Sequence, residues 1–382
     1  MRRLFPLVAA VVLVDTMFFA AVAPLLPHYS DELGLSKTAA GVLAAAYPAG
    51  TLVGSLPSGG LAARVGVKRT VLLGLAILAV TSVVFAFANH VVLLDAARFA
   101  QGVGGACSWT GGMAWLVSAS SPDKRGTLIG SALGAAIVGV LLGPALGGLA
   151  TLIGPEVVFS GVGVLAVGLA AWAWSLPGAA REPSAGVGAA VRALGRPSVI
   201  SAFWLFTLPA IFGGTIEVLA PLRLDELGAS GAAIGVVFLL IAAVEAVLSP
   251  VSGRLSDRHG RLAPIRVGRA GAIVMAVLLP LPGTVVGLAF ALAATVAALG
   301  AFWAPAMALL ADASENVGLD PALAFGLSNL AWAGGHMAGS AGGATLADAT
   351  ADAVPYALLG VACALSLVGL LRSRARQRPV EA

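Results

Sequence analysis

Long apolar segments separated by short polar ones repeat along the whole chain. A helix needs roughly 20 apolar residues to cross the hydrocarbon core of a bilayer. Segments of that length predict twelve membrane-spanning helices, at residues 4–27, 38–60, 70–88, 91–116, 127–151, 156–176, 199–222, 232–252, 266–282, 285–311, 322–346 and 353–371. The pattern predicts an all-α membrane protein with six helices in each half.

One polar loop occurs twice. GGLAARVGVKR occupies residues 59–69 and GRLSDRHGR occupies residues 253–261, so the second copy begins 194 residues after the first. Such a repeat predicts two similar halves, residues 1–180 and 198–382, joined by a cytoplasmic linker at 181–197 that is rich in Gly, Ala, Pro and Arg. Among the positions at which the copies differ, Asp257 in the second corresponds to Ala63 in the first.

Composition and charge support this prediction. Charged residues make up 10% and apolar residues 59% of the chain, whereas a soluble domain carries roughly a quarter charged residues. With both termini in the cytoplasm, cytoplasmic segments hold 19 of the 22 Lys and Arg residues, the outside keeps Lys37 and Arg223, and Arg98 lies within a span. This asymmetry obeys the positive-inside rule. We therefore expect a multi-pass protein of the plasma or inner membrane, whose basic loops need no nucleic-acid partner.

Sequence motifs for enzymatic or ATP-driven work are missing. The sequence has no GxxxxGK motif and no recognisable Ser, His and Asp set, and its four histidines lack metal-ligand spacing. We expect a monomeric transporter in the lipid bilayer that is not an enzyme, needs no cofactor or metal, and moves a small molecule with energy from an ion gradient.

Two glycine-rich spans add to the paired loops. RFAQGVGGA at residues 98–106 includes Gln101 and Gly102, and the predicted fifth span carries Gly130, Gly139, Gly143, Pro144, Gly147 and Gly148. Glycines at every fourth position let a neighbouring helix approach closely, and proline bends a helix, so we expect a seal or hinge between the halves here. Together with the loops, these motifs resemble the major facilitator superfamily, and the fifth-span pattern is similar to the signature of its twelve-span drug:proton antiporters.

This resemblance implies a conformational role for the two loops. It places gating residues at Gly59, Arg64, Gly66, Gly253, Asp257, Arg258, Gly260 and Arg261. By the same resemblance, Asp257 latches the cytoplasmic side by bonding to the neighbourhood of Lys124 and Arg125, a latch that Ala63 cannot form in the first half. The alternative is a solvated loop charge, because exposed ion pairs often contribute little.

Ionisable residues within the predicted spans are few, and each charge costs roughly 2.5–3.5 kcal/mol at the bilayer centre. They are Asp15, Asp95, Arg98, Glu217, Glu245 and His336, with Asp312 at a cytoplasmic helix end. Asp15 lies near the middle of the first span and shares a helix face with Phe19, which indicates a site for an amphipathic cation or a proton. Trp109 and Trp303 lie deep enough in their spans to line a cavity.

Opposite charges at similar depth in different halves are the second clue. Arg98 and Glu217 predict an ion pair that closes the external side. The alternatives for Arg98 are a local pair with Asp95 or capping of first-span carbonyls.

Three further residues are candidates for a proton relay. They are His336, Asp312 and Glu245, and the imidazole suits proton transfer because its pKa lies near neutrality. The alternatives are a packed, hydrogen-bonded histidine and a structural partner for the glutamate.

A narrower resemblance concerns three spans. VDTMFFAAVAPLLP around Asp15, GTIEVLAP around Glu217 and LLADASE around Asp312 resemble the vesicular monoamine transporter family, whose members exchange cationic amines for protons. The chain departs from that family at Tyr47 and Asn329, where the family has lysine and aspartate, so the monoamine substrate does not carry over.

These observations predict proton-coupled efflux of lipophilic or cationic small molecules by alternating access of two six-helix halves. Asp15 is expected to take the proton or cation, Arg98 and Glu217 to set the outer gate, and Asp257 the inner latch. Two alternatives stay open. One is a transporter of an anionic metabolite anchored by Arg98, and the other is a non-transporting membrane sensor or scaffold with the same fold.

Overall fold

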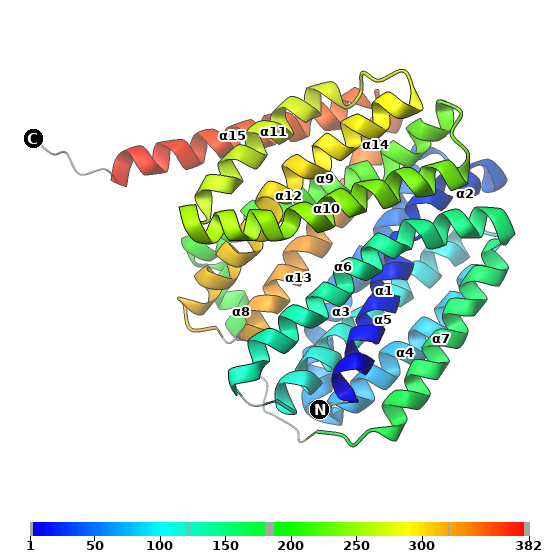
Figure 1. The fold of residues 1–382 in the computed structure, drawn as a ribbon, viewed down its shortest axis with the longest axis vertical. Helices are drawn as coiled ribbons and strands as arrows, with labels where there is room; N and C mark the ends of the chain where they lie inside the picture. Colours follow the sequence, from blue (N-terminus) through cyan, green and yellow to red (C-terminus); the bar gives the residue numbers. More distant parts are fainter. Residues whose placement is uncertain (1–2, 121, 180–186, 320, 378–382) are drawn as a thin grey trace, which may run out of the picture.

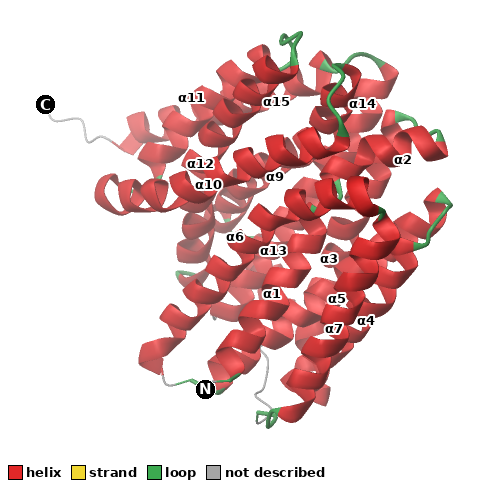
Figure 2. Ribbon diagram, turned by 45° about the vertical axis from the view of Figure 1, so that its right-hand side comes forward, coloured by secondary structure: helices red, strands yellow, loops and turns green. Residues whose placement is uncertain are grey.

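The computed structural model describes residues 3–120, 122–179, 187–319 and 321–377. All regular secondary structure within these ranges is helical (Figure 2). The fold is therefore the all-α arrangement that the apolar segments predict.

We call α1–α7 the N-terminal half and α9–α15 the C-terminal half. The N-terminal half contains α1 (Leu4–Ala20), the 3-10 helix η1 (Ala23–Leu25), α2 (Leu26–Leu33), α3 (Lys37–Val65), α4 (Val67–Ala86), α5 (Val91–Ser118), α6 (Pro122–Ile153) and α7 (Pro155–Ser175). The short α8 (Val187–Leu194) lies within the segment expected to be a linker. The C-terminal half contains α9 (Pro197–Glu226), α10 (Gly231–His259), α11 (Leu262–Leu278), α12 (Val285–Glu315), α13 (Pro321–Met337), the π-helix η2 (Ala338–Gly343), α14 (Ala344–Ala349) and α15 (Ala353–Gln377).

Nine helical segments within the described residues are long and apolar enough to cross a membrane. The other predicted spans correspond to α5, α11 and the run α13–η2–α14. Of these, α5 carries Asp95 and Arg98, whereas α11 and α13 are each 17 residues long. These three still pack in the bundle, with α5 against α3 and α4, α11 against α12 and α15, and α13 against α9.

Two predicted details change in the structure. The first span is interrupted after Ala20, because Pro24 and Pro27 cannot donate to a continuous helical ladder. Arg269, which the loop count assigned to the cytoplasmic side, is fully buried within α11 and donates to Ser366 of α15.

The internal repeat extends to the turns that start and end helices. Gly34 and Gly228 have positive φ values of 62° and 87°, and Gly66 and Gly260 have values of 97° and 80°. Residues with a side chain rarely adopt a positive φ, which explains why glycine occupies these four turns. Each pair is 194 residues apart, the separation of the two loops. The repeat therefore sets the backbone of both halves, beyond the loops that revealed it.

Each half has its own buried apolar core. One core is formed by residues of α1–α7 together with Val218 and Ala344, and the other by residues of α8–α15. The halves meet along two seams (Figure 1). In the first seam α3 packs against α13, η2 and α14, and in the second α6 packs against α10.

Equivalent glycines bring backbones together in both seams. A Cβ at Gly41 of α3 would lie 2.6 Å from the carbonyl oxygen of Ser340, and one at Gly235 of α10 would lie 2.8 Å from that of Pro144. These two glycines are again 194 residues apart. Both seams therefore depend on the absence of a side chain at the same repeat position.

The fifth-span glycine stripe has a different partner from the one expected. Cβ atoms at Gly139 and Gly143 would collide with the backbone or side chains of α1, and one at Gly147 would collide with the backbone of Ala21 directly after it, in the same half. Gly148, in contrast, faces Gly235 across the second seam. The stripe fixes α1 to α6, and the contacts of α6 with the other half come from the neighbouring Pro144 and Gly148.

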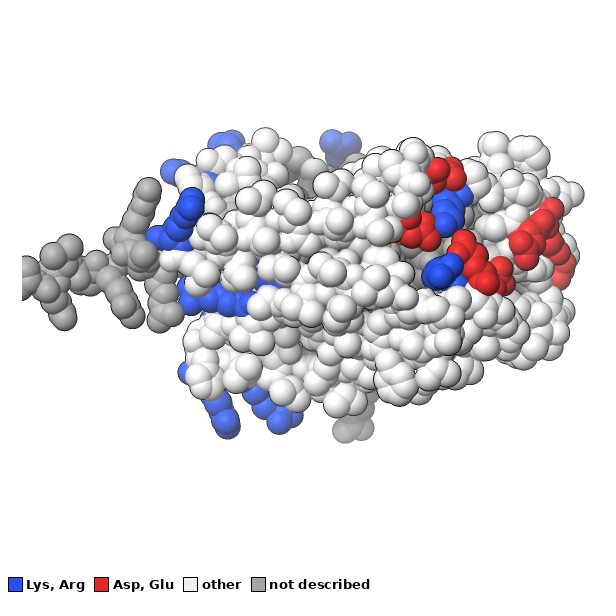
Figure 3. Space-filling model, turned by 90° about the horizontal axis from the view of Figure 1, so that it is seen from above, with Lys and Arg blue, Asp and Glu red and all other residues white. Residues whose placement is uncertain are grey.

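Charge is distributed unevenly between the two ends of the bundle. Figure 3 shows most of the visible Lys and Arg side chains at one end of the bundle, where α15 ends, and Asp and Glu side chains, with some basic ones among them, at the opposite end. We call these the basic end and the acidic end.

Candidate functional site

A buried carboxylate lies at the centre of the N-terminal half. Asp15 of α1 is 1% exposed, and its Oδ2 accepts a hydrogen bond of 2.7 Å from Tyr47 Oη of α3 and one of 3.2 Å from Trp109 Nε1 of α5. Gly105 of α5 leaves the space for this contact, because a Cβ there would lie 2.7 Å from the Tyr47 hydroxyl oxygen and 2.9 Å from each carboxylate oxygen. Three helices thus position one carboxylate between neutral donors.

Arg98 lies beside this cluster and is fully buried. Its Nη1 donates to Gln101 Oε1 at 2.7 Å, and its Nη2 donates to the Phe19 carbonyl oxygen at 3.2 Å. The guanidinium carbon is 5.1 Å from the ring centroid of Tyr47 and 5.8 Å from that of Phe19, distances at which aromatic rings attract a cation. A fixed positive charge therefore accompanies the buried carboxylate.

The expected ion pairs of Arg98 are not the contacts observed. Its hydrogen bonds go to a neighbouring amide and to a first-span carbonyl, where α1 is interrupted. Oδ1 of Asp95 is buried without a hydrogen-bond partner, and the partner of Glu217 is a different residue. The outer-gate ion pair predicted between the halves is therefore absent from the described part of the chain.

Glu217 of α9 forms an ion pair and hydrogen bond with His336 of α13. Both side chains are 10% exposed, and both helices belong to the C-terminal half. Nδ1 of His336 is buried and has no hydrogen-bond partner. This pair is a second buried polar contact, separate from the Asp15 cluster.

One aromatic side chain connects the two halves of the site. The Phe19 ring centroid lies 4.9 Å from that of Tyr47, 5.4 Å from Trp332 and 5.6 Å from His336. Tyr47 binds Asp15 and His336 binds Glu217, so the rings form a continuous layer between two buried carboxylates. A ligand with an apolar, aromatic or cationic surface suits this layer.

Other predicted residues lie away from this layer. Trp303 contacts Phe206 edge-to-face within the C-terminal half, with 5.3 Å between ring centroids. Asp312 is half exposed and forms an ion pair with Arg261 at 3.2 Å. Glu245 is half-buried on α10, and no hydrogen bond or ion pair links it to His336 in the described residues. The structure therefore does not assemble the three-residue relay.

The paired loops have structural contacts at the basic end. Lys68 of the first loop donates to the carbonyl oxygens of Trp174 and Leu176 at 2.6 Å each, which caps the end of α7. In the second loop, the Arg261 ion pair ties the start of α11 to the end of α12. Arg64 and Arg258 are exposed. The side chains of Asp257, Lys124 and Arg125, which form the predicted inner latch, lie outside the described residues.

Sequence reasoning missed how some site residues are combined. Tyr47 entered only as a departure from a resembled family, although it donates the shorter hydrogen bond to Asp15. The contact between Glu217 and His336 joins residues 119 positions apart. A signal for it was present, since both are isolated ionisable residues in apolar spans.

The chain is similar to known transporters. The model of the Major Facilitator Superfamily matches residues 8–319 and 210–382. The chain is 34% identical over 122 residues to the human synaptic vesicular amine transporter, covering 32% of the chain and 24% of that protein. It is 30% identical over 141 residues to the MFS-type transporter ppzB of Metarhizium majus, covering 35% and 31%. The matched segments thus span a third or less of these relatives' lengths.

Solved structures of transporters share the fold. A D-xylose-proton symporter matches with a TM-score of 0.75 and 16% identity over 96% of each chain. A bacterial homologue of the human lysosomal transporter Spinster, in an inward-facing conformation, matches with a TM-score of 0.75 and 15% identity over 97% of this chain and 95% of that one. With the family match over most of its length, the chain belongs to the major facilitator superfamily and is a multi-pass membrane transporter, not an enzyme.

Proposed function

We propose that this transporter exchanges a lipophilic organic cation for protons and exports it from the cell. The observation that carries this proposal is the buried Asp15 carboxylate, held by Tyr47 and Trp109 and continuous with the Phe19 aromatic layer.

The chemistry of a buried carboxylate supports coupling. A buried charge in a low-dielectric interior is costly, and a proton or a bound cation lowers that cost beyond what the neighbouring Arg98 does, because the hydrogen bonds of Arg98 go to Gln101 and Phe19 and not to Asp15. Tyr47 and Trp109 are neutral donors, so their hydrogen bonds do not supply the positive charge that a proton or a bound cation supplies. Because one carboxylate cannot be fully neutralised by both at once, binding of the proton and of the cation compete, which is what antiport requires.

The surrounding rings support an organic cation. Tyr47 and Phe19 already face the Arg98 guanidinium, and a ligand cation can be attracted by the same ring faces. The similarity to a protein named a vesicular amine transporter favours an amine. The fifth-span glycine pattern favours a drug:proton antiporter.

We include the orientation of the protein in the membrane in this proposal. The basic end in Figure 3 would face the cytoplasm of the cell, as the positive-inside rule requires. Both termini then lie in the cytoplasm, and the acidic end faces outward.

The test uses the purified protein in proteoliposomes with an imposed pH gradient. We expect proton-driven accumulation of a fluorescent lipophilic cation, and at least a tenfold loss with Asp15→Asn. Asp95→Asn is the matched control, because Asp95 lies outside the aromatic layer and its Oδ1 has no partner. Full proton-driven transport by Asp15→Asn would refute the coupling role.

A ligand panel separates the alternatives. Transport of anions in place of cations would make Arg98 the substrate anchor. Binding without flux in any vesicle would favour a sensor or scaffold.

A further inference from the structure

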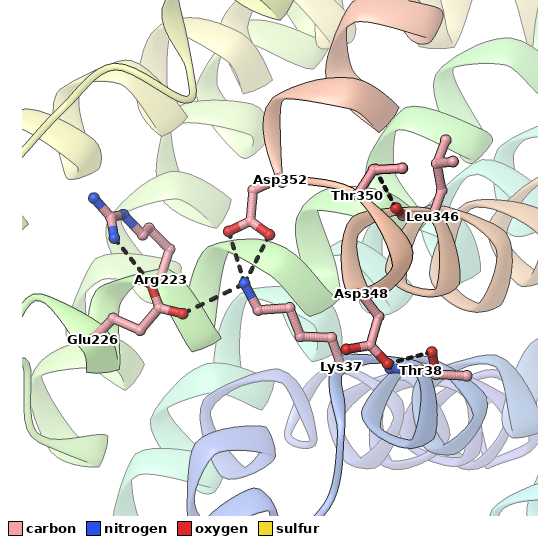
Figure 4. A network of polar contacts seen from close by, with 8 residues as sticks. All are labelled: Lys37, Thr38, Arg223, Glu226, Leu346, Asp348, Thr350 and Asp352. Atoms are coloured by element: carbon pink, nitrogen blue, oxygen red, sulfur yellow. Dashed lines mark hydrogen bonds and ion pairs between the residues drawn. The ribbon is translucent and has the colours of Figure 1, made fainter.

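Side chains from both halves meet at the acidic end of the first seam (Figure 4). Lys37 and Thr38 are the first two residues of α3, in the N-terminal half. Three carboxylates of the C-terminal half approach them: Glu226 at the end of α9, Asp348 in α14 and Asp352 just before α15.

Lys37 binds two of these carboxylates. Its Nζ lies 2.7 Å from Oδ1 and 3.0 Å from Oδ2 of Asp352, and 3.4 Å from Oε1 of Glu226. The Lys37 and Asp352 side chains are 28% and 27% exposed, so water and salt reach a pair that is still mostly enclosed. One ammonium group thus joins two C-terminal elements to the N-terminal half.

Thr38 binds the third carboxylate. Its Oγ1 donates to Asp348 Oδ2 at 2.6 Å, and its backbone N–H donates to the same oxygen at 3.3 Å. The first N–H groups of a helix lack intrahelical partners and carry partial positive charge. Asp348 therefore caps α3 from the opposite half.

These contacts connect the two halves to each other and do not join elements within one half. Each of them joins α3 to the C-terminal half. A neighbouring pair provides the contrast: Arg223 Nη1 lies 2.9 Å from Glu226 Oε2, three residues away on the same helix. Loss of the Arg223 pair removes a similar charge contact without releasing the seam.

Within the described residues, the second seam shows no such contact at the equivalent position. Gly231 follows Lys37 by 194 residues, and a Cβ there would meet the Thr151 side chain of α6 at 2.7 Å. A cavity of about 410 Å³, lined in part by Lys37, Arg223, Asp352 and Tyr356, lies beside the charged cluster. It leaves room for Lys37 to move when the cluster opens.

We propose that Lys37 and Thr38 form a latch with Glu226, Asp348 and Asp352 that holds the acidic end closed during the transport cycle. The proposed orientation makes this the outer gate, in place of the ion pair expected between Arg98 and Glu217. Opening toward the outside then requires Lys37 and Thr38 to leave three carboxylates, at one seam only.

The test measures distances across the acidic end in the full-length protein in nanodiscs. Spin labels at Val92→Cys of α5 and Val286→Cys of α12 report on opposite halves, since both side chains are well exposed. Cys107 and Cys363 are buried and are replaced by alanine. We expect Lys37→Ala to raise the population with the longer distance at least threefold. Arg223→Ala should leave the distribution unchanged.

Charge exchange and salt provide independent readouts. Lys37→Asp combined with Asp352→Lys should return the distribution toward wild type. Raising the ionic strength to 1 M, where the screening length is roughly 3 Å, should lengthen the distance in wild type but not in Lys37→Ala. Equal distributions for wild type and Lys37→Ala at all salt concentrations, or equal shifts for Lys37→Ala and Arg223→Ala, would overturn the latch.

The result is independent of the proposed substrate. If Lys37→Ala fails to fold, the salt titration of wild type and the milder Asp348→Asn variant still decide the question. A wild-type distance distribution that does not change with salt concentration would then exclude the latch. The measurement uses no substrate and no proton gradient, so failure of cation transport and failure of the latch are distinguishable.

Discussion

The two seams between the halves have equivalent backbones and different chemistry. Gly41 and Gly235 occupy the same repeat position, and each lets a helix approach the backbone of the other half. At the acidic end, however, the first seam has Lys37 and Thr38 facing carboxylates, whereas the second has Gly231 against Thr151. The comparison teaches that duplication can supply a symmetric scaffold while single side chains differ: at the acidic end, the described residues make the first seam ionic and the second steric.

The relative size of these contributions follows from the contacts. A side chain forced into a close backbone contact costs roughly 1–3 kcal/mol. An exposed ion pair contributes only about 0.2–1 kcal/mol. We therefore expect steric changes in either seam to exceed changes to the latch.

The largest effect is expected from adding one methyl group at the seam glycines. Gly41→Ala and Gly235→Ala should each lower stability by about 1–3 kcal/mol, because the new Cβ meets backbone or packed side chains. Thermal unfolding in detergent measures this as a lower Tm. Gly59→Ala is the control, since no atom lies within 4 Å of its Cβ and alanine favours a helix by roughly 0.5–1 kcal/mol. A lower Tm in only one of these two variants would show that the two seams are not equivalent.

The next largest effect is expected from removing the aromatic ring of Phe19, which contacts the opposite half within the candidate site. Phe19→Ala removes the edge-to-face contacts with Trp332 and His336, where each aromatic pair contributes about 0.5–1.5 kcal/mol beyond its buried area. We expect weaker binding of a lipophilic cation, by roughly tenfold, in a direct binding assay. Phe19→Tyr keeps the ring and should bind within about threefold of wild type. Unchanged affinity in the alanine variant would remove the aromatic layer from the site.

A smaller effect is expected from the Thr38 contact alone. Asp348→Asn keeps the shape of the side chain but removes its charge, so the loss should be about 0.2–1 kcal/mol, or less than a fivefold rise in the open population. Distances between spin labels at Val92 and Val286 report it. A shift greater than that of Lys37→Ala would mean that Asp348 dominates the latch.

The smallest effect is the pH dependence of this same carboxylate. The side-chain hydrogen bond from Thr38, followed by the one from its backbone N–H, lowers the pKa of Asp348 below its ordinary value. A lowered pKa means that the contact is fully present above the pKa of the free carboxyl group, roughly 3.9, and is lost as the pH falls through the lower value.

The ratio of open populations in Asp348→Asn and wild type isolates this group from other titrating residues. It should be constant between pH 8 and pH 5, and should approach one only under stronger acid. A ratio that changes between pH 7 and pH 5 would contradict the assigned role of the Thr38 hydrogen bonds.

The sequence predicted the elements better than the contacts between them. Apolar length identified the helices, and the doubled loop identified a repeat whose turns at Gly66 and Gly260 share a positive φ. Asp15 and Trp109 were predicted to lie deep in their spans, but not as partners, because the pattern along one helix does not specify which neighbour it meets. Lys37 stood out only as a basic residue outside the cytoplasmic segments, and its two partners, Glu226 and Asp352, are distant from it in the sequence.

The glycine stripe of α6 has a mechanical consequence. Gly139, Gly143 and Gly147 bring the α6 backbone against α1 with almost no side chain between them, and close-packed backbone contacts deform little. Pro144 and Gly148 of the same helix touch the opposite half, while α1 carries Asp15. The two helices are therefore expected to move together as a rigid unit. A displacement of α6 at the second seam then also displaces α1 and the Asp15 carboxylate that it carries.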